Sequence, residues 1–190
     1  MRIITGKYKG RHFDIPHTFK ARPTTDFAKE NIFNVLGGYL DFEDITALDL
    51  FAGTGSITLE LLSRGCSQVV SVEKDRDHHR FILQCLAKLQ GEQNPQPDAK
   101  CIRGDVFRFL KSCKIQFDFI FADPPYALKE LPTLPDVIFN NNLLRDNSKD
   151  NNNVGKSLFV LEHGKDYDFS QHPHFVEHRH YGSVNFSIFR

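Results

Sequence analysis

The stretch FDFIFADPPY, residues 117–126, combines a buried strand with a rigid polar turn. Residues 117–122 are almost wholly apolar and aromatic, which is typical of a parallel strand covered on both faces. The two prolines stop this strand and fix their own φ angles, so the side chains of Asp123 and Tyr126 are held in place. A carboxylate, proline carbonyls and a flat ring are the groups needed to hold a planar ring that carries an exocyclic amine. A simple Asp-Pro turn at the end of a core strand is the alternative.

A second buried strand, residues 45–51, ends in the glycine turn AGTG at 52–55 and leads into a helix at 56–62. This order is the first βα unit of a doubly wound fold, whose ligands bind at the carboxyl ends of the strands. The third glycine of the dinucleotide fingerprint would fall at position 58, where the chain has Thr58. A nicotinamide or flavin site is therefore disfavoured.

Acidic residues follow the next two strands. Residues 68–73 form a strand that ends in Glu73, about 20 residues after the first glycine, a spacing at which a carboxylate can bind ribose hydroxyls. A surface glutamate at a strand end is the alternative. Asp105 follows a strand at 99–103, and it could cap the next helix or reach an adenine amine.

The rest of the pattern completes an α/β protein. We expect a mostly parallel central sheet with helices on both faces, a Rossmann-like arrangement with an antiparallel C-terminal strand. Further helices are expected at 26–36, at 74–89 and, interrupted by prolines, at 129–139, and further strands at 156–162, 175–181 and 184–189. The Asn-rich residues 140–153 are interpreted as a loop or insertion.

Charge is balanced over the 190 residues, with a formal net charge of zero, so any nucleic-acid contact must be local. Residues 1–20 are predicted to form a basic β-hairpin extension to a main domain at 21–190. The hairpin either grips phosphates, with Tyr8 as its aromatic, or is simply a solvated edge. Its basic side chains are Arg2, Lys7, Lys9 and Arg11.

Cysteines and histidines give little support for a metal site. The four cysteines are widely spaced, which is typical of a reducing cytosol. Four late histidines fall in pairs two residues apart, at 172 and 174 and at 178 and 180, without a third-ligand pattern. From these spacings we expect a protein without a metal. There is no apolar run long enough to span a bilayer, and together with the scattered cysteines this predicts a cytoplasmic protein.

Taken together, these features resemble the class I S-adenosylmethionine-dependent methyltransferases that act on exocyclic amines, and most closely the bacterial 16S rRNA (guanine-N2) methyltransferase family often called RsmD. Thr58 stands where that family often has glycine, Ala122 replaces a larger apolar residue, and residues 140–153 look like an addition. The matching segments are RIITGKYKGR at 2–11, RPTTD at 22–26, LDLFAGTG at 48–55, LSRG at 62–65, VEKD at 72–75, DPPY at 123–126, EH at 162–163 and YG at 181–182.

The resemblance implies transfer of a methyl group from S-adenosylmethionine to the N2 amine of a guanine in small-subunit rRNA, within the subunit or a late assembly intermediate, by a monomer. It implies a catalytic loop of Asp123, Pro124, Pro125 and Tyr126. It places the cofactor against Thr24, Asp49, Phe51, Ala52, Gly53, Thr54, Gly55, Glu73, Lys74, Asp105 and Val106. RNA contacts are expected from Arg2, Lys7, Lys9, Arg11 and Arg22.

Two other functions stay open from the sequence. A DNA adenine-N6 methyltransferase could share the DPPY loop and its chemistry, although the chain has little room for a target-recognition region. A non-catalytic module could keep the cofactor pocket and bind RNA or a partner without transfer, but it would have no need of Asp123, Tyr126 and Glu73 together.

Overall fold

Apolar side chains on both sides of the central strands produce a sheet that is covered on both faces. The computed structural model describes residues 1–19, 25–90, 98–146 and 157–190. Its strands are β1 (Thr46–Leu50), β2 (Gln68–Glu73), β3 (Asp98–Arg103), β4 (Phe119–Ala122), β5 (Leu158–His163), β6 (Phe175–Tyr181) and β7 (Val184–Phe189). Its helices are α1 (Asp26–Leu36), α2 (Ser56–Ser63), α3 (Arg76–Gln90), α4 (Val106–Ser112), the 3₁₀ helix η1 (Leu131–Thr133) and α5 (Leu134–Asn140).

The seven strands form one sheet in the order β3-β2-β1-β4-β5-β7-β6. The first five strands in this order are parallel, and β7 runs antiparallel to both β5 and β6. The strand order reverses direction between β1 and β4, and a doubly wound sheet opens a crevice at that point, outside the carboxyl ends of its strands. The glycine turn after β1 and the proline turn after β4 therefore lie side by side.

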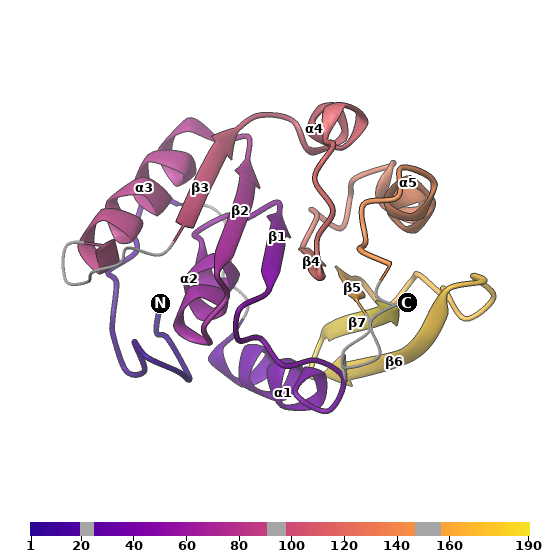
Figure 1. Ribbon diagram of the computed structural model, residues 1–190, viewed down its shortest axis with the longest axis horizontal. Helices are drawn as coiled ribbons and strands as arrows, with labels where there is room; N and C mark the ends of the chain where they lie inside the picture. The colour runs from indigo at the N-terminus through magenta and orange to yellow at the C-terminus, as the bar shows by residue number, and fades with distance from the viewer. Residues whose placement is uncertain (20–24, 91–97, 147–156) are drawn as a thin grey trace.

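The two faces of the sheet carry separate apolar cores. Phe119 and Phe121 of β4 pack on the side of α1, α2 and α3, whereas Ile120 and Ala122 pack on the side of α4, η1 and α5. Figure 1 shows this division, with α4 and α5 on one side of the sheet and α1 to α3 on the other. The predicted fold class, a Rossmann-like α/β sheet with an antiparallel C-terminal strand, is confirmed.

The N-terminal segment is more integrated than a hairpin extension. One antiparallel bridge, between Arg2 and His12, replaces the two expected strands. Tyr8 is only 3% exposed and joins the core on the α2 side. Its ring is therefore unavailable to RNA, which corrects one of the two alternatives, the phosphate-gripping arm with Tyr8 as its aromatic. Whether residues 1–20 and 21–190 behave as two units stays a prediction.

Polar groups of α1 and α2 hold this segment down. The backbone N–H groups of Ile4 and Thr5 donate to the buried Glu60 carboxylate at 2.8 and 3.1 Å. Lys29, fully buried, donates through Nζ to the Arg2 carbonyl at 2.7 Å and lies 3.7 Å from Glu60 Oε2. Burial lowers the pKa of Lys29, and the Glu60 charge opposes that shift. The paired charges anchor the segment beside Ser56, whose hydroxyl also accepts from Lys29 at 3.0 Å.

The prolines and histidines in the second half of the chain have local structural roles. Prolines at 132 and 135 interrupt the helix predicted at 129–139, as expected, and divide it into η1 and α5, because proline removes a backbone donor. The late histidines do not converge on a metal: His174 stacks on Phe139 with centroids 3.8 Å apart, and His178 bonds Asn185. Within the described ranges, no three His, Cys, Asp or Glu side chains gather closely enough to hold a metal ion. Of the helices described, none has the length and apolar character needed to cross a membrane.

Candidate active site

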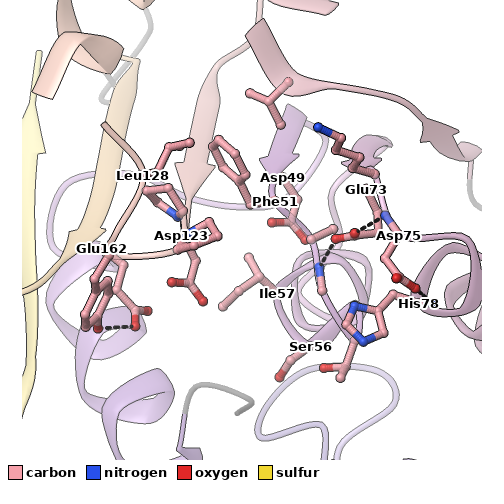
Figure 2. A pocket seen from close by; sticks show the side chains of 18 of the residues that line it. Asp49, Phe51, Ser56, Ile57, Glu73, Asp75, His78, Asp123, Leu128 and Glu162 are labelled. Carbon is pink, nitrogen blue, oxygen red and sulfur yellow. Dashed lines mark hydrogen bonds between the residues drawn. The ribbon is translucent and has the colours of Figure 1, made fainter. Parts of the chain in front are cut away.

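A cleft of about 1070 Å³ opens at the carboxyl ends of β1, β2 and β4. Figure 2 shows Asp123 and Glu162 on one side of the cleft and Glu73, Asp75 and His78 on the other. We call these the proline-turn side (residues 123–126 and Glu162) and the glycine-turn side (Asp49, residues 51–55 and Glu73). The remaining lining comes from Thr25, Ser56, Ile57, Lys74, Arg76, Asp105, Val106, Phe107, Leu128, Ser183 and Val184.

The glycine turn bends the chain sharply between β1 and α2. Phe51, Gly53 and Gly55 all have positive φ angles, of 59°, 54° and 77°. A side chain at Gly55 would be strained by that angle, and its Cβ would lie 2.9 Å from Ile82 Cγ1 on α3. A non-glycine residue in this backbone region, such as Phe51, is typical of a functional turn. The sequence folds this way because glycine allows α2 to begin directly over the cleft.

Glu73 holds the glycine turn from the end of β2. Its Oε2 atom accepts from the Gly53 N–H at 2.7 Å, and its Oε1 atom accepts from the Asp75 N–H at 2.7 Å. One buried carboxylate thus fixes the loops that follow both β1 and β2. Each carboxylate oxygen has a second lone pair, so Glu73 can still accept from a ligand hydroxyl in the cleft.

Asp49 lies in β1, below the turn, and is 1% exposed. Thr58 of α2 donates to its Oδ2 atom twice, from its backbone N–H at 2.9 Å and from its hydroxyl at 2.5 Å. Burial raises the pKa of Asp49 to about 7, the Thr58 hydrogen bonds oppose that shift, and the charges of Asp123 and Glu73 add to it. The residue that breaks the dinucleotide fingerprint therefore positions an acid on the cleft wall.

The proline-turn side comes from two separate segments, the turn after β4 and the end of β5. Asp123 is half-buried at the end of β4, where its N–H donates to the Leu50 carbonyl of β1 at 3.2 Å. The Tyr126 hydroxyl donates to Glu162 Oε1 of β5 at 3.1 Å. Burial, followed by the charges of Glu162 and Asp123, raises the pKa of Tyr126, so this hydroxyl stays protonated. Tyr126 is 41% exposed, so its ring remains accessible at the cleft.

A family model described as Conserved hypothetical protein 95 matches residues 1–190. The chain belongs to this family. It is 31% identical over 146 residues to ribosomal RNA small subunit methyltransferase D of Escherichia coli K12, covering 77% of this chain and 70% of that protein. It is 33% identical over 150 residues to the protein of the same name from Haemophilus influenzae, covering 78% and 75%.

Solved structures agree with this assignment. The solved structure described as "Putative methyltransferase yhhF from Escherichia coli" superposes with a TM-score of 0.80 at 26% identity, covering 100% of this chain and 96% of that one. The fold is therefore that of the class I methyltransferases. The resemblance to the 16S rRNA methyltransferase family that the motifs indicated is confirmed.

The structure brings most of the predicted site residues of this family member together. All four residues of the predicted catalytic loop line the cleft, and so do the predicted cofactor residues other than Thr24 and Gly55. Gly55 shapes the turn beneath the cleft, whereas Thr24 and Arg22 lie outside the described residues. Asp105 does cap α4, by accepting from the Arg108 N–H at 3.1 Å, and it also lines the cleft.

The four described residues of the predicted RNA-binding set lie outside the cleft, on the N-terminal segment. Arg2 Nε is 3.2 Å from Asp26 Oδ2 at the start of α1. The segment borders the glycine-turn side, where the Thr54 hydroxyl lies 3.6 Å from Met1 Sδ. Arg2 therefore lies near the cleft without entering it, whereas the Lys7 N–H donates at 2.7 Å to the carbonyl of Ser63, the last residue of α2, away from the start of that helix at the cleft.

Among the residues that the sequence did not assign to the site, Glu162 and Thr58 form hydrogen bonds to predicted site residues. Glu162 lines the cleft and bonds Tyr126, but in the sequence it appears only within the Glu-His pair that ends β5. Thr58 was interpreted only as a missing glycine. The sequence signal available for Glu162 was its place at the carboxyl end of a buried strand, next to the strand that precedes Asp123.

Proposed function

We propose that this chain transfers a methyl group from S-adenosylmethionine to the exocyclic N2 amine of a guanine in small-subunit rRNA. The observation that carries the proposal is that the DPPY turn and the glycine turn face one cleft, with Asp123 and Glu73 on its two sides. Relatives of this chain carry the name ribosomal RNA small subunit methyltransferase D.

The residues of the glycine-turn side suit this cofactor. Carboxylates of Asp49, Glu73 and Asp105 line the cleft, and acidic acceptors match a ligand with ribose hydroxyls, amines and a positive charge. Ordinary ligand pockets measure roughly 300–1,000 Å³, so a cleft of about 1070 Å³ has room for a cofactor and a base together. We assign Glu73 to the ribose, Asp105 with Val106 to the adenine, and residues 51–55 to the methionine part.

The proline-turn side suits the acceptor. S-adenosylmethionine supplies an electrophilic methyl group on a sulfonium. The guanine amine is a weak nucleophile because its lone pair is delocalised into the ring. Asp123 and the Pro124 carbonyl accept hydrogen bonds from the amine hydrogens, and this stabilises the amine as it becomes tetrahedral. Tyr126 stacks on the base and aligns it for attack, so positioning supplies much of the rate. In the transfer, the bond between sulfur and the methyl carbon would break as the nitrogen–carbon bond forms, S-adenosylhomocysteine would leave, and the nitrogen would lose one proton to Asp123 or to water.

The base must leave its stack to reach this cleft, which costs a few kcal/mol and less when the nucleotide is already exposed. We therefore propose an assembled small-subunit particle as the substrate, bound by a monomer. Arg2, Lys7, Lys9, Arg11 and Arg22 are proposed to contact its phosphates, since a chain with no net charge needs a local basic surface.

The test is transfer of radiolabelled methyl from S-adenosylmethionine to small subunits lacking the modification, to free rRNA and to duplex DNA, with products identified by nucleoside mass spectrometry. The proposal predicts N2-methylguanosine in the subunit. If the product is N6-methyladenine in DNA, the assigned site is correct but the substrate is DNA and not rRNA. Absence of any product, in a preparation that binds S-adenosylhomocysteine, would contradict the proposal and favour a non-catalytic module.

A further inference from the structure

Phe27, on the first turn of α1, is a large apolar side chain left in solvent beside the cleft. It is 64% exposed, the highest fraction among the exposed large hydrophobic residues that the structure describes. A single exposed apolar side chain needs no explanation on its own. The position of Phe27 relative to the cleft and to a second ring gives it significance.

Phe27 forms an edge contact with Tyr181 of β6, with ring centroids 6.4 Å apart and planes at 87°. Both rings are next to residues that line the cleft. Thr25, the N-cap of α1, lines it two residues before Phe27, and Ser183 and Val184 line it just after Tyr181. The two rings therefore lie on a rim where α1 and the β6–β7 turn meet at the cleft.

A positive charge lies on the same rim. Arg2 pairs with Asp26, the residue before Phe27, and both side chains are nearly half exposed, at 46% and 43%. An exposed pair of this kind contributes little to stability, and its guanidinium can exchange a carboxylate for a phosphate. Aromatic rings beside a basic side chain form the combination that binds single-stranded nucleic acid, with the bases stacked and the backbone neutralised.

We propose that Phe27 and Tyr181 form a stacking surface for an rRNA nucleotide next to the guanine that enters the cleft, with Arg2 placed to meet its phosphate. This inference rests on the proposed function. A base that leaves its stack also removes one stacking partner from its neighbour, and an aromatic side chain can replace that partner. Continuity of the rim with the cleft favours the substrate strand itself as the occupant over a separate protein partner.

Phe27 also suits a test by substitution. Because about two thirds of the side chain is already in solvent, its truncation removes little buried area and leaves the fold intact. The variants Phe27→Ala, Phe27→Leu and Phe27→Tyr separate loss of bulk from loss of the ring. Ile115→Ala is the matched control. Ile115 is 47% exposed and precedes β4, so it lies near the amino ends of the strands, whereas the cleft lies at their carboxyl ends.

The experiment measures KM for small subunits, kcat, and S-adenosylhomocysteine affinity for each variant. Stacking of one base on an aromatic is worth about 1–3 kcal/mol, so Phe27→Ala and Phe27→Leu should each raise KM about tenfold. Phe27→Tyr and Ile115→Ala should stay within about twofold of wild type, and cofactor affinity should not change in any variant.

Two results would overturn the inference. If the wild type methylates subunits and Phe27→Ala keeps the same KM, then this ring does not bind the substrate. If Phe27→Ala raises KM but Phe27→Leu keeps the wild-type KM, the surface recognises apolar bulk instead of stacking a base. A wild type that binds S-adenosylhomocysteine but does not methylate subunits would instead refute the proposed function and, with it, this inference.

Discussion

On the glycine-turn side of the cleft, acidic side chains bind the protein's own backbone, whereas on the proline-turn side they come together from separate strands. Glu73 accepts from two backbone N–H groups and Asp49 is fixed by Thr58. Across the cleft, Asp123 follows β4, and Tyr126 is held by Glu162 of β5 through a single hydrogen bond between side chains. Hydrogen bonds to backbone groups therefore fix the acidic side chains of the glycine-turn side, whereas the Tyr126 ring on the proline-turn side is exposed. Substitutions on the first side should therefore disturb folding and cofactor binding, and those on the second should disturb transfer.

The largest effect is expected for Asp123→Ala. Removing a group that stabilises the developing transition state typically costs 10²–10³ in rate, and we expect a loss of that order in methyl transfer to small subunits. Thermal stability should change little, because Asp123 is half-buried and the following prolines still fix the turn. Asp41→Ala, at an exposed carboxylate near the amino end of β1, is the control. A near wild-type transfer rate for Asp123→Ala would contradict the assignment.

A pair of glycine substitutions sharpens the comparison. Gly55→Ala introduces a side chain at a φ of 77° and 2.9 Å from Ile82, so it should lower the free energy of unfolding by about 2 kcal/mol and weaken cofactor binding. Gly164→Ala brings a Cβ within 3.3 Å of Tyr126 Cδ2 without a positive φ. It should displace the ring slightly and slow transfer with little loss of stability. Urea unfolding and transfer assays check both variants. If both variants lower the free energy of unfolding equally, the two sides of the cleft do not differ in their contribution to stability.

The buried acid of the glycine-turn side predicts a pH dependence of stability. The pKa of Asp49 is raised to about 7 in the folded protein from an ordinary value of 3.8, so the folded state binds the proton more tightly than the unfolded chain. Its contribution to stability is complete below pH 3.8 and is lost as the pH rises through about 7. From pH 6 to pH 8 the loss is about 1 kcal/mol. Urea unfolding of wild type and Asp49→Asn at several pH values measures this loss. If the free energy of unfolding has the same slope against pH in both proteins, the raised pKa of Asp49 is contradicted.

The smallest effects are expected at the hydrogen bond between Tyr126 and Glu162, beginning with Tyr126→Phe. This change keeps the ring and removes one hydrogen bond, which is worth about 1 kcal/mol, so transfer should fall roughly fivefold. Glu162→Gln keeps an acceptor for the Tyr126 hydroxyl and should have a smaller effect, while Glu162→Ala should slow transfer at least as much as Tyr126→Phe, because this buried carboxylate has interactions besides the one with Tyr126. The combination of Tyr126→Phe with Glu162→Ala should be no worse than Glu162→Ala alone. Additive losses in the double variant would show that the two residues act independently.

The same comparison explains what could be predicted from the sequence. The glycine turn, the acid after β2 and the DPPY turn are local signals, because each lies at the end of a buried strand. The contact between Tyr126 and Glu162 joins residues 36 apart in the chain, and it depends on the order of the strands in the sheet. Tyr8 lies in a basic stretch that indicated an exposed arm, yet the pairing of Lys29 with Glu60 draws that segment onto α2. The hydrogen bond from Thr58 to Asp49 could not be predicted from the sequence, because it depends on how α2 packs over β1.

The most direct test of the two-sided cleft is calorimetric titration of S-adenosylhomocysteine into wild type, Glu73→Ala and Asp123→Ala. Loss of Glu73 releases two backbone loops and removes a proposed ribose acceptor, so affinity should fall at least about tenfold. Asp123→Ala should bind within about threefold of wild type, although it no longer transfers methyl groups. If Asp123→Ala loses cofactor affinity as severely as Glu73→Ala, the cleft is not divided into a cofactor side and an acceptor side.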